Sequence, residues 1–78
     1  MASSYQVANK TGQTIWWRDG GWTSGDLPPG DVRTVESDHN ADVTMFGKGQ
    51  GGDREWGRVW ILLGKTLEVY GDKDWHLK

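Results

Sequence analysis

The chain has 78 residues, with twelve glycines, six tryptophans and no cysteine. That length holds one small domain over residues 1–78 and excludes a kinase, a barrel enzyme or a two-domain dehydrogenase. Without cysteine there is no disulfide, no thiolate metal site and no cysteine nucleophile. Hydrophobic residues make up 35% of the chain, which is a thin core for so short a protein. We therefore expect self-association into a homo-oligomer to support the fold.

The charge balance excludes further classes. Nine Lys and Arg residues face eleven Asp and Glu residues, for a net charge of -2. Nucleic-acid binders usually carry a basic stripe, so we expect no nucleic-acid partner. The longest apolar run, 59–63, is too short for a transmembrane helix. The start of the chain has neither a charged nor an apolar signal region, which favours a cytoplasmic or leaderless-secreted protein.

Turn-forming residues recur five to twelve positions apart along the chain, and this spacing is typical of an all-β domain with short strands. We predict a small antiparallel sandwich or barrel-like domain of six or seven strands. The segments with alternating, β-branched or aromatic residues are 3–8, 14–17, 32–37, 43–46, 61–63, 66–70 and 75–77. The expected turns are 9–12, 19–21, 28–30, 38–40, 47–53, 64–65 and 71–73.

The segment 53–64 fits two structures. Its large apolar residues are three or four positions apart, as on one face of a helix. Gly57 lies inside it, however, and costs about 1 kcal/mol relative to alanine in a helix. We therefore predict a strand with both faces buried, in a sandwich or at an oligomer interface. Gly64 and Lys65 would then form a two-residue type II′ hairpin loop leading into 66–70.

Aromatic excess is the main functional signal. Trp16 and Trp17 are neighbours on a predicted strand, so their side chains point to opposite faces. Trp22 lies in a predicted loop and Trp75 near the C-terminus, and both are poor candidates for a core built on strands. A single tryptophan is most often buried. Six of them exceed the interior that a chain of this length can offer.

An exposed indole beside short polar groups suits carbohydrate. Sugars place C–H faces on indole rings, and their hydroxyls bond to Asp, Arg and backbone amides. We predict a lectin that captures glycans non-covalently, with avidity from the oligomer. The candidate ligand-binding residues form three clusters: Trp17, Arg18, Asp19 and Trp22; Arg54 and Trp56, beside Glu55; and Asp72, Asp74, Trp75 and His76.

The stretch 5–35 resembles one blade segment of the small fucose-binding β-propeller lectins of fungi and bacteria. The residues that follow the blade order are Asp19, Gly20, Trp22, Gly25, Pro29 and Gly30. Arg18 replaces the tryptophan that precedes Asp-Gly in a blade. Tyr5 and Ile15 stand near the positions of the family's sugar-holding Arg and Glu. The resemblance implies a lectin-like function in which Trp22 is the one sugar contact that carries over.

Two other functions remain open. The Asn9–Gly12 turn, the Pro-Gly turn and the tryptophan-rich late strands resemble aegerolysin-type membrane-binding sandwiches. That resemblance implies docking on lipid headgroups at a membrane surface, where Trp and Tyr are favoured. In the second alternative the protein is a structural, self-assembling subunit with its tryptophans at the interfaces.

No constellation of residues predicts catalysis. A G-x-G-x-x-G pattern at 47–52 lacks the helix and βαβ unit of a dinucleotide site, so we interpret it as a hairpin loop. Asp72, Asp74 and His76 would share a strand face and could hold a cation, but a solvated strand end is the preferred interpretation. Asn9 begins an N-glycosylation sequon. We predict a non-enzymatic binding protein with no cofactor and no metal.

Overall fold

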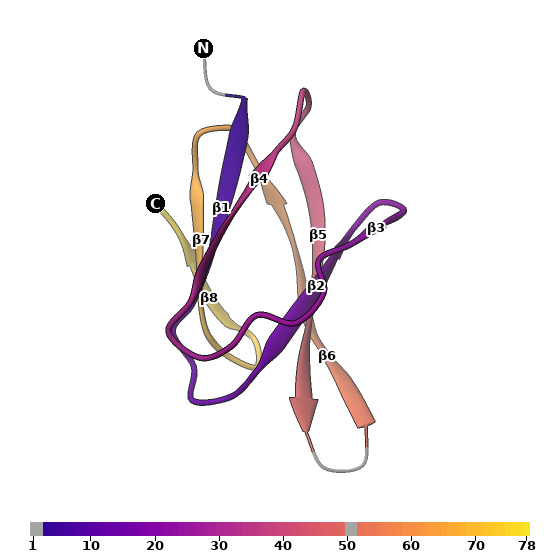
Figure 1. Cartoon of the computed structure of the whole chain (residues 1–78), viewed down its shortest axis with the longest axis vertical. Helices are drawn as coiled ribbons and strands as arrows, with labels where there is room; N and C mark the ends of the chain where they lie inside the picture. Colours follow the sequence, from indigo (N-terminus) through magenta and orange to yellow (C-terminus); the bar gives the residue numbers. More distant parts are fainter. Residues whose placement is uncertain (1–2, 50–51) are drawn as a thin grey trace.

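A computed structural model describes residues 3–49 and 52–78. Within these residues it is all-β, as predicted, and contains no helix that could cross a membrane. Figure 1 shows two groups of strands facing each other, which are the four-stranded sheets β4-β1-β7-β8 and β3-β2-β5-β6. The strands are β1 (Ser4–Asn9), β2 (Ile15–Asp19), β3 (Trp22–Thr23), β4 (Val32–Glu36), β5 (Ala41–Gly49), β6 (Gly52–Ile61), β7 (Thr66–Gly71) and β8 (Asp74–Leu77).

One strand pair departs from the predicted antiparallel arrangement. β1 and β7 run parallel, with Val7 opposite Leu67. Between β1 and β7 the chain crosses to the second sheet for β2 and β3, returns to the first sheet for β4, and crosses again for β5 and β6. A long connection of this kind lets two strands of the same direction become neighbours. Residues 5–35 supply strands to both sheets, whereas a propeller blade is a single four-stranded sheet.

The segment 53–64 is mainly strand, as predicted, because β6 covers Gly52–Ile61. Within a single chain only one of its faces is buried, and burial of the other face at an oligomer interface stays a prediction. Trp56 and Ile61 are buried, but the Trp60 side chain is 56% exposed. β6 is the edge strand of the second sheet and pairs with β5 alone. The two sheets face each other, and no third layer covers the outer face of β6 in the described structure.

The described residues of the predicted turn at 47–53 belong to strands. β5 runs to Gly49 and β6 starts at Gly52, and these two residues pair with each other. Residues 50–51 lie outside the described part of the chain. The two strands form an antiparallel hairpin, and no βαβ unit surrounds the glycines in the described structure.

The predicted type II′ hairpin at Gly64 and Lys65 is also wrong. β6 and β7 belong to different sheets, so this turn carries the chain from one sheet to the other. The Lys65 backbone N–H donates to the Leu62 carbonyl at 3.2 Å. Gly64 has φ +89°, which the third residue of a type II turn requires. β7 pairs with β1 and β8 instead.

Inward-facing residues of both sheets meet in one core. Trp17 is the largest fully enclosed side chain, and the Arg33 guanidinium lies 5.7 Å from its ring centroid. The core consists of Tyr5, Val7, Ile15, Trp17, Leu27, Ala41, Val43, Met45, Trp56, Ile61, Leu67 and Val69.

The Trp56 ring packs directly against Gly47 in this core. A Cβ at Gly47 would overlap the ring, with 2.6 Å to Trp56 Nε1. We expect Gly47→Ala to lower the free energy of unfolding by about 1–3 kcal/mol, because it overpacks the site. Gly49→Ala is the matched control, since the space around Gly49 is open. Urea unfolding of both variants checks this, and equal midpoints would contradict it.

Candidate functional site

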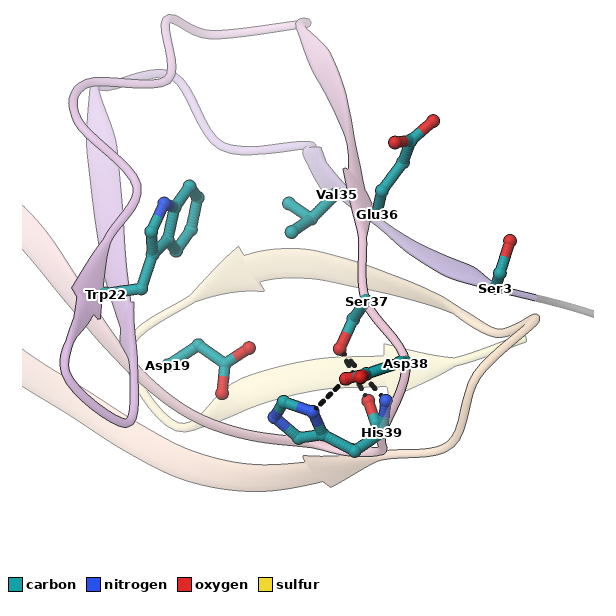
Figure 2. Close-up of a pocket in the computed structure, with 8 residues that line it drawn as sticks. All are labelled: Ser3, Asp19, Trp22, Val35, Glu36, Ser37, Asp38 and His39. Atoms are coloured by element: carbon teal, nitrogen blue, oxygen red, sulfur yellow. Dashed lines mark hydrogen bonds and ion pairs between the residues drawn. The ribbon is translucent and has the colours of Figure 1, made fainter.

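A cleft of about 650 Å³ opens between the β2–β3 hairpin and the residues that end and follow β4. We call it the Trp22 cleft. Figure 2 shows the Trp22 ring and the Asp19 carboxylate on one side and the turn at 37–39 on another. Its lining residues are Ser3, Asp19, Trp22, Val35, Glu36, Ser37, Asp38 and His39.

The β2–β3 hairpin brings Asp19 and Trp22 together. These two residues pair across the strands, with Gly20 and Gly21 between them, which confirms the turn predicted there. Gly20 has φ +58°, as the first central residue of a type II′ loop requires. Residues directly opposite on paired strands share one face. The hairpin therefore presents a carboxylate and an indole side by side.

Trp22 rests on the core but is open to solvent. Its ring is tilted at 54° to the Trp17 ring, with the centroids 6.1 Å apart. Trp22 is 44% exposed and Trp17 is 0% exposed. The predicted site residue Trp17 is therefore enclosed in the core and supports the platform without being part of its surface.

The loop after β3 is tied to the core strand beside it. The Trp17 backbone N–H donates to Ser24 Oγ at 2.8 Å. The Arg33 guanidinium donates to the carbonyls of Ser24 and Asp26. These bonds fix the backbone of the residues that follow β3 in the chain. The position of Trp22 on β3 is therefore held from its C-terminal side.

A polar chain leads from the core to the cleft. The Trp17 Nε1–H donates to the Tyr5 hydroxyl at 3.3 Å, and the Tyr5 hydroxyl donates to Asp19 Oδ2 at 3.1 Å. Burial, the largest cause, raises the pKa of Tyr5 to about 12. The Tyr5 hydroxyl therefore keeps its proton at neutral pH and holds the Asp19 carboxylate in place.

The raised pKa of Tyr5 predicts a loss of stability in alkali. Between the ordinary pKa of 10.0 and about 12, the unfolded chain releases a proton that the folded chain keeps. The free energy of unfolding should therefore fall by about 2 kcal/mol as the pH rises through this window. Tyr5→Phe should lose less stability over the same range, and urea unfolding at several pH values measures both. Equal losses in parent and variant would contradict this.

The Trp22 cleft is acidic. Its described lining includes the carboxylates of Asp19, Glu36 and Asp38 and contains no Lys or Arg. His39 Nδ1 lies 2.7 Å from Asp38 Oδ1, and this hydrogen bond lowers the pKa of Asp38. The Asp38 carboxylate is thus ionised at neutral pH, and the field of the acidic cleft disfavours anionic ligands.

Arg18 does not join this cleft. It lies on the outer face of the second sheet, where its guanidinium is 5.9 Å from the Trp16 ring and 5.7 Å from the Phe46 ring. Those two rings are stacked with centroids 4.1 Å apart. Alternation along β2 places Arg18 on the opposite face from its neighbours Trp17 and Asp19. The first predicted cluster is therefore split between core, cleft and outer face.

A second cleft of about 510 Å³ joins parts of the other two predicted clusters. We call it the Tyr70 cleft. Arg54 and Asp72 form an ion pair across it, with 3.1 Å between Nη2 and Oδ2. Trp56 lines the cleft although only 6% of its surface is exposed. The lining residues are Thr11, Gly12, Gln13, Arg54, Trp56, Tyr70, Gly71 and Asp72.

Asp74, Trp75 and His76 line neither of these clefts. Trp75 packs against the core, and a Cβ on Gly57 would overlap its ring. The expectation that Trp75 is a poor core candidate is therefore wrong, because it covers the core from β8. His76 Nε2 lies 3.6 Å from Asp74 Oδ1. Asp72 is in the preceding turn, and no metal-binding cluster occurs among residues 3–49 and 52–78.

The wall of the Tyr70 cleft is organised by Asn9, whose side chain is fully buried. Its Nδ2 donates to the carbonyls of Gln13 and Leu27, at 2.8 and 3.0 Å. Its Oδ1 accepts from Thr11 N at 2.9 Å and from Thr11 Oγ1 at 2.6 Å. A sugar attached to Nδ2 would replace one of its two donated N–H groups and would need space at a side chain that is fully buried. The sequon at Asn9 is therefore not an acceptor in the folded chain.

Tyr70, loop 11–13 and segment 36–39 are cleft residues that were not predicted from the sequence. All of them except Gln13 fall in predicted strands or turns, but the partner across each cleft is distant in the sequence. Comparisons with protein-family models, with curated proteins and with solved structures found no match for this chain.

Proposed function

We propose that this protein is a carbohydrate-binding protein that holds a sugar unit in the Trp22 cleft. The observation that supports this most is the Trp22 indole, which is 44% exposed while it lines a cleft. A sugar ring places its C–H face on the indole. Its hydroxyls donate to the Asp19 carboxylate, which the Tyr5 hydroxyl holds at 3.1 Å.

The charge of the cleft indicates which sugars it takes. Carboxylates accept hydrogen bonds from hydroxyl and ammonium groups but repel carboxylate, sulfate and phosphate groups. An ammonium group near the Trp22 face also gains a cation–π interaction. The cleft therefore selects neutral sugars and amino sugars over sialylated or sulfated glycans. The same field argues against an anionic lipid headgroup as the ligand.

Self-assembly is a second candidate function, which two exposed side chains favour. Trp60 is 56% exposed and Leu62 is 48% exposed, and neither lines the Trp22 or the Tyr70 cleft. Trp60 lies on β6, an edge strand, and edge strands offer backbone groups for pairing with another chain. Light scattering of the parent and of Trp60→Ala separates this function from sugar binding.

A panel of neutral, cationic and anionic sugars tests the proposed function. The panel contains methyl glycosides of glucose, galactose, mannose, fucose and N-acetylglucosamine, together with glucosamine and sialyllactose. We expect neutral sugars or glucosamine to shift the Trp22 indole N–H resonance. Added salt should weaken the binding of glucosamine and leave the binding of neutral sugars unchanged. Preferential binding of sialyllactose, or an unmoved Trp22 resonance throughout the panel, would contradict the proposal.

A further inference from the structure

The two clefts lie at opposite ends of β1. Ser3, just before β1, lines the Trp22 cleft, and the loop that follows β1 lines the Tyr70 cleft. A six-residue strand spans about 20 Å. Figure 1 agrees, because the β4–β5 turn lies at the top of the molecule and the β1–β2 and β7–β8 turns lie lower down. One small ligand cannot occupy both clefts.

We propose that the Tyr70 cleft is a second carbohydrate site, so that each chain binds two glycans. This inference rests on the proposed function of the Trp22 cleft but uses different residues. Tyr70 is 42% exposed and supplies the ring surface. Arg54 and Asp72, 3.1 Å apart, offer a donor and an acceptor to neighbouring hydroxyls of one sugar.

The floor of the Tyr70 cleft is open and its wall is already in place. Apart from the glycine itself and its two chain neighbours, no residue has a heavy atom within 4 Å of a Cβ built on Gly12 or Gly71, so a ligand can reach their backbone. The bonds that Asn9 makes to Thr11 and Gln13 hold the loop in one conformation. A preformed wall lowers the ordering cost of binding.

The two sites differ in charge and should differ in selectivity. Arg54 and Asp72 are the charged residues among the described residues that line the Tyr70 cleft, and their charges cancel. The Trp22 cleft has three carboxylates and no Lys or Arg in its described lining. The Tyr70 cleft should therefore take neutral sugars without preference for an ammonium group, whereas the Trp22 cleft should prefer glucosamine.

Two sites facing different directions would make a single chain a cross-linker. Joining weak sites raises avidity by roughly 10² to 10⁴ without new contacts. On this proposal, avidity at a glycan-covered surface does not depend on an oligomer. An oligomer would multiply the number of sites further.

The test titrates the full chain with the methyl glycosides and glucosamine while following indole and backbone N–H resonances. The Trp22 signal reports one cleft, and the Trp56 and Tyr70 signals report the other. We expect a neutral sugar to move both sets, and the two sets to follow separate binding curves. Tyr70→Ala and Arg54→Ala should each weaken the second curve at least tenfold and leave the first unchanged. Lys10→Ala is the control, since it removes an exposed cation that lines neither cleft.

The outcomes separate the two proposals. Movement of the Trp22 signal alone, with binding weakened in Trp22→Ala, would overturn the second site and leave the proposed function intact. Movement of the Trp56 and Tyr70 signals alone would support the second site and overturn the proposed role of Trp22. If no sugar moves either set, both proposals are wrong.

Discussion

Trp22→Ala is expected to weaken sugar binding in the Trp22 cleft by about 10- to 30-fold, as truncation of a tryptophan hot spot does. Trp22 is the single indole among the described residues that line this cleft. Without its ring, the C–H face of a sugar would meet solvent instead of an apolar surface. The Asp19 carboxylate would remain, so hydrogen bonding alone would hold the ligand. The titration of indole and backbone N–H resonances measures the loss.

Trp60→Ala is the matched control for this prediction. Trp60 is at least as exposed as Trp22, at 56% against 44%, but it lines neither cleft. Its truncation should leave sugar affinity unchanged. Trp22→Phe keeps a smaller ring and should show an intermediate loss, while thermal unfolding of each variant confirms that it is folded. Equal losses in Trp22→Ala and Trp60→Ala would contradict a specific role for the cleft.

Asn9→Asp is expected to destabilise the fold by about 3–5 kcal/mol, the usual cost of an unpaired buried charge. The Asn9 amide donates to two backbone carbonyls. A carboxylate in its place would lose both donations and would face those carbonyl oxygens at close range. A loss of this size is a large part of the stability of a small domain. Urea unfolding at neutral pH measures it.

Asn40→Asp supplies the control. Asn40 uses its side-chain oxygen to accept from the Leu63 backbone N–H at 3.1 Å, and a carboxylate can still accept that bond. The exchange of amide for carboxylate is therefore chemically the same at both positions, but only at Asn9 does it remove buried donors. If Asn9→Asp unfolds no more easily than Asn40→Asp, the structural role given to Asn9 is wrong.

Local pattern was enough to predict most of the strands and several turns, although β3 lies in a predicted loop. Alternation over 3–8 predicted a strand, and β1 covers Ser4–Asn9 with Tyr5 and Val7 buried. In the turn at 28–30, the Asp31 N–H donates to the Pro28 carbonyl, and Gly30 has φ +82°. Proline followed by glycine is the local signature of a type II turn. Such features depend on a few adjacent residues and can be read without knowing the rest of the fold.

Pairing between distant segments could not be predicted in the same way. Gly64 predicted a hairpin between β6 and β7, but β1 and β8 are the strands that pair with β7. Trp75, at the end of the chain, packs over Gly57 in the other sheet. Neither contact can be predicted from the residues that adjoin it in the sequence. For the same reason, the two walls of the Trp22 cleft could not be assigned to each other.

The amino-acid sequence alone established the all-β class, the acidic charge balance and the large number of tryptophans for a chain of this length. Tertiary packing decided that Trp17 is enclosed, that Trp22 faces a cleft, and that Arg54 meets Asp72. The reason is that alternation along a strand shows which side chains share a face. It does not show whether that face meets another sheet, another loop or solvent.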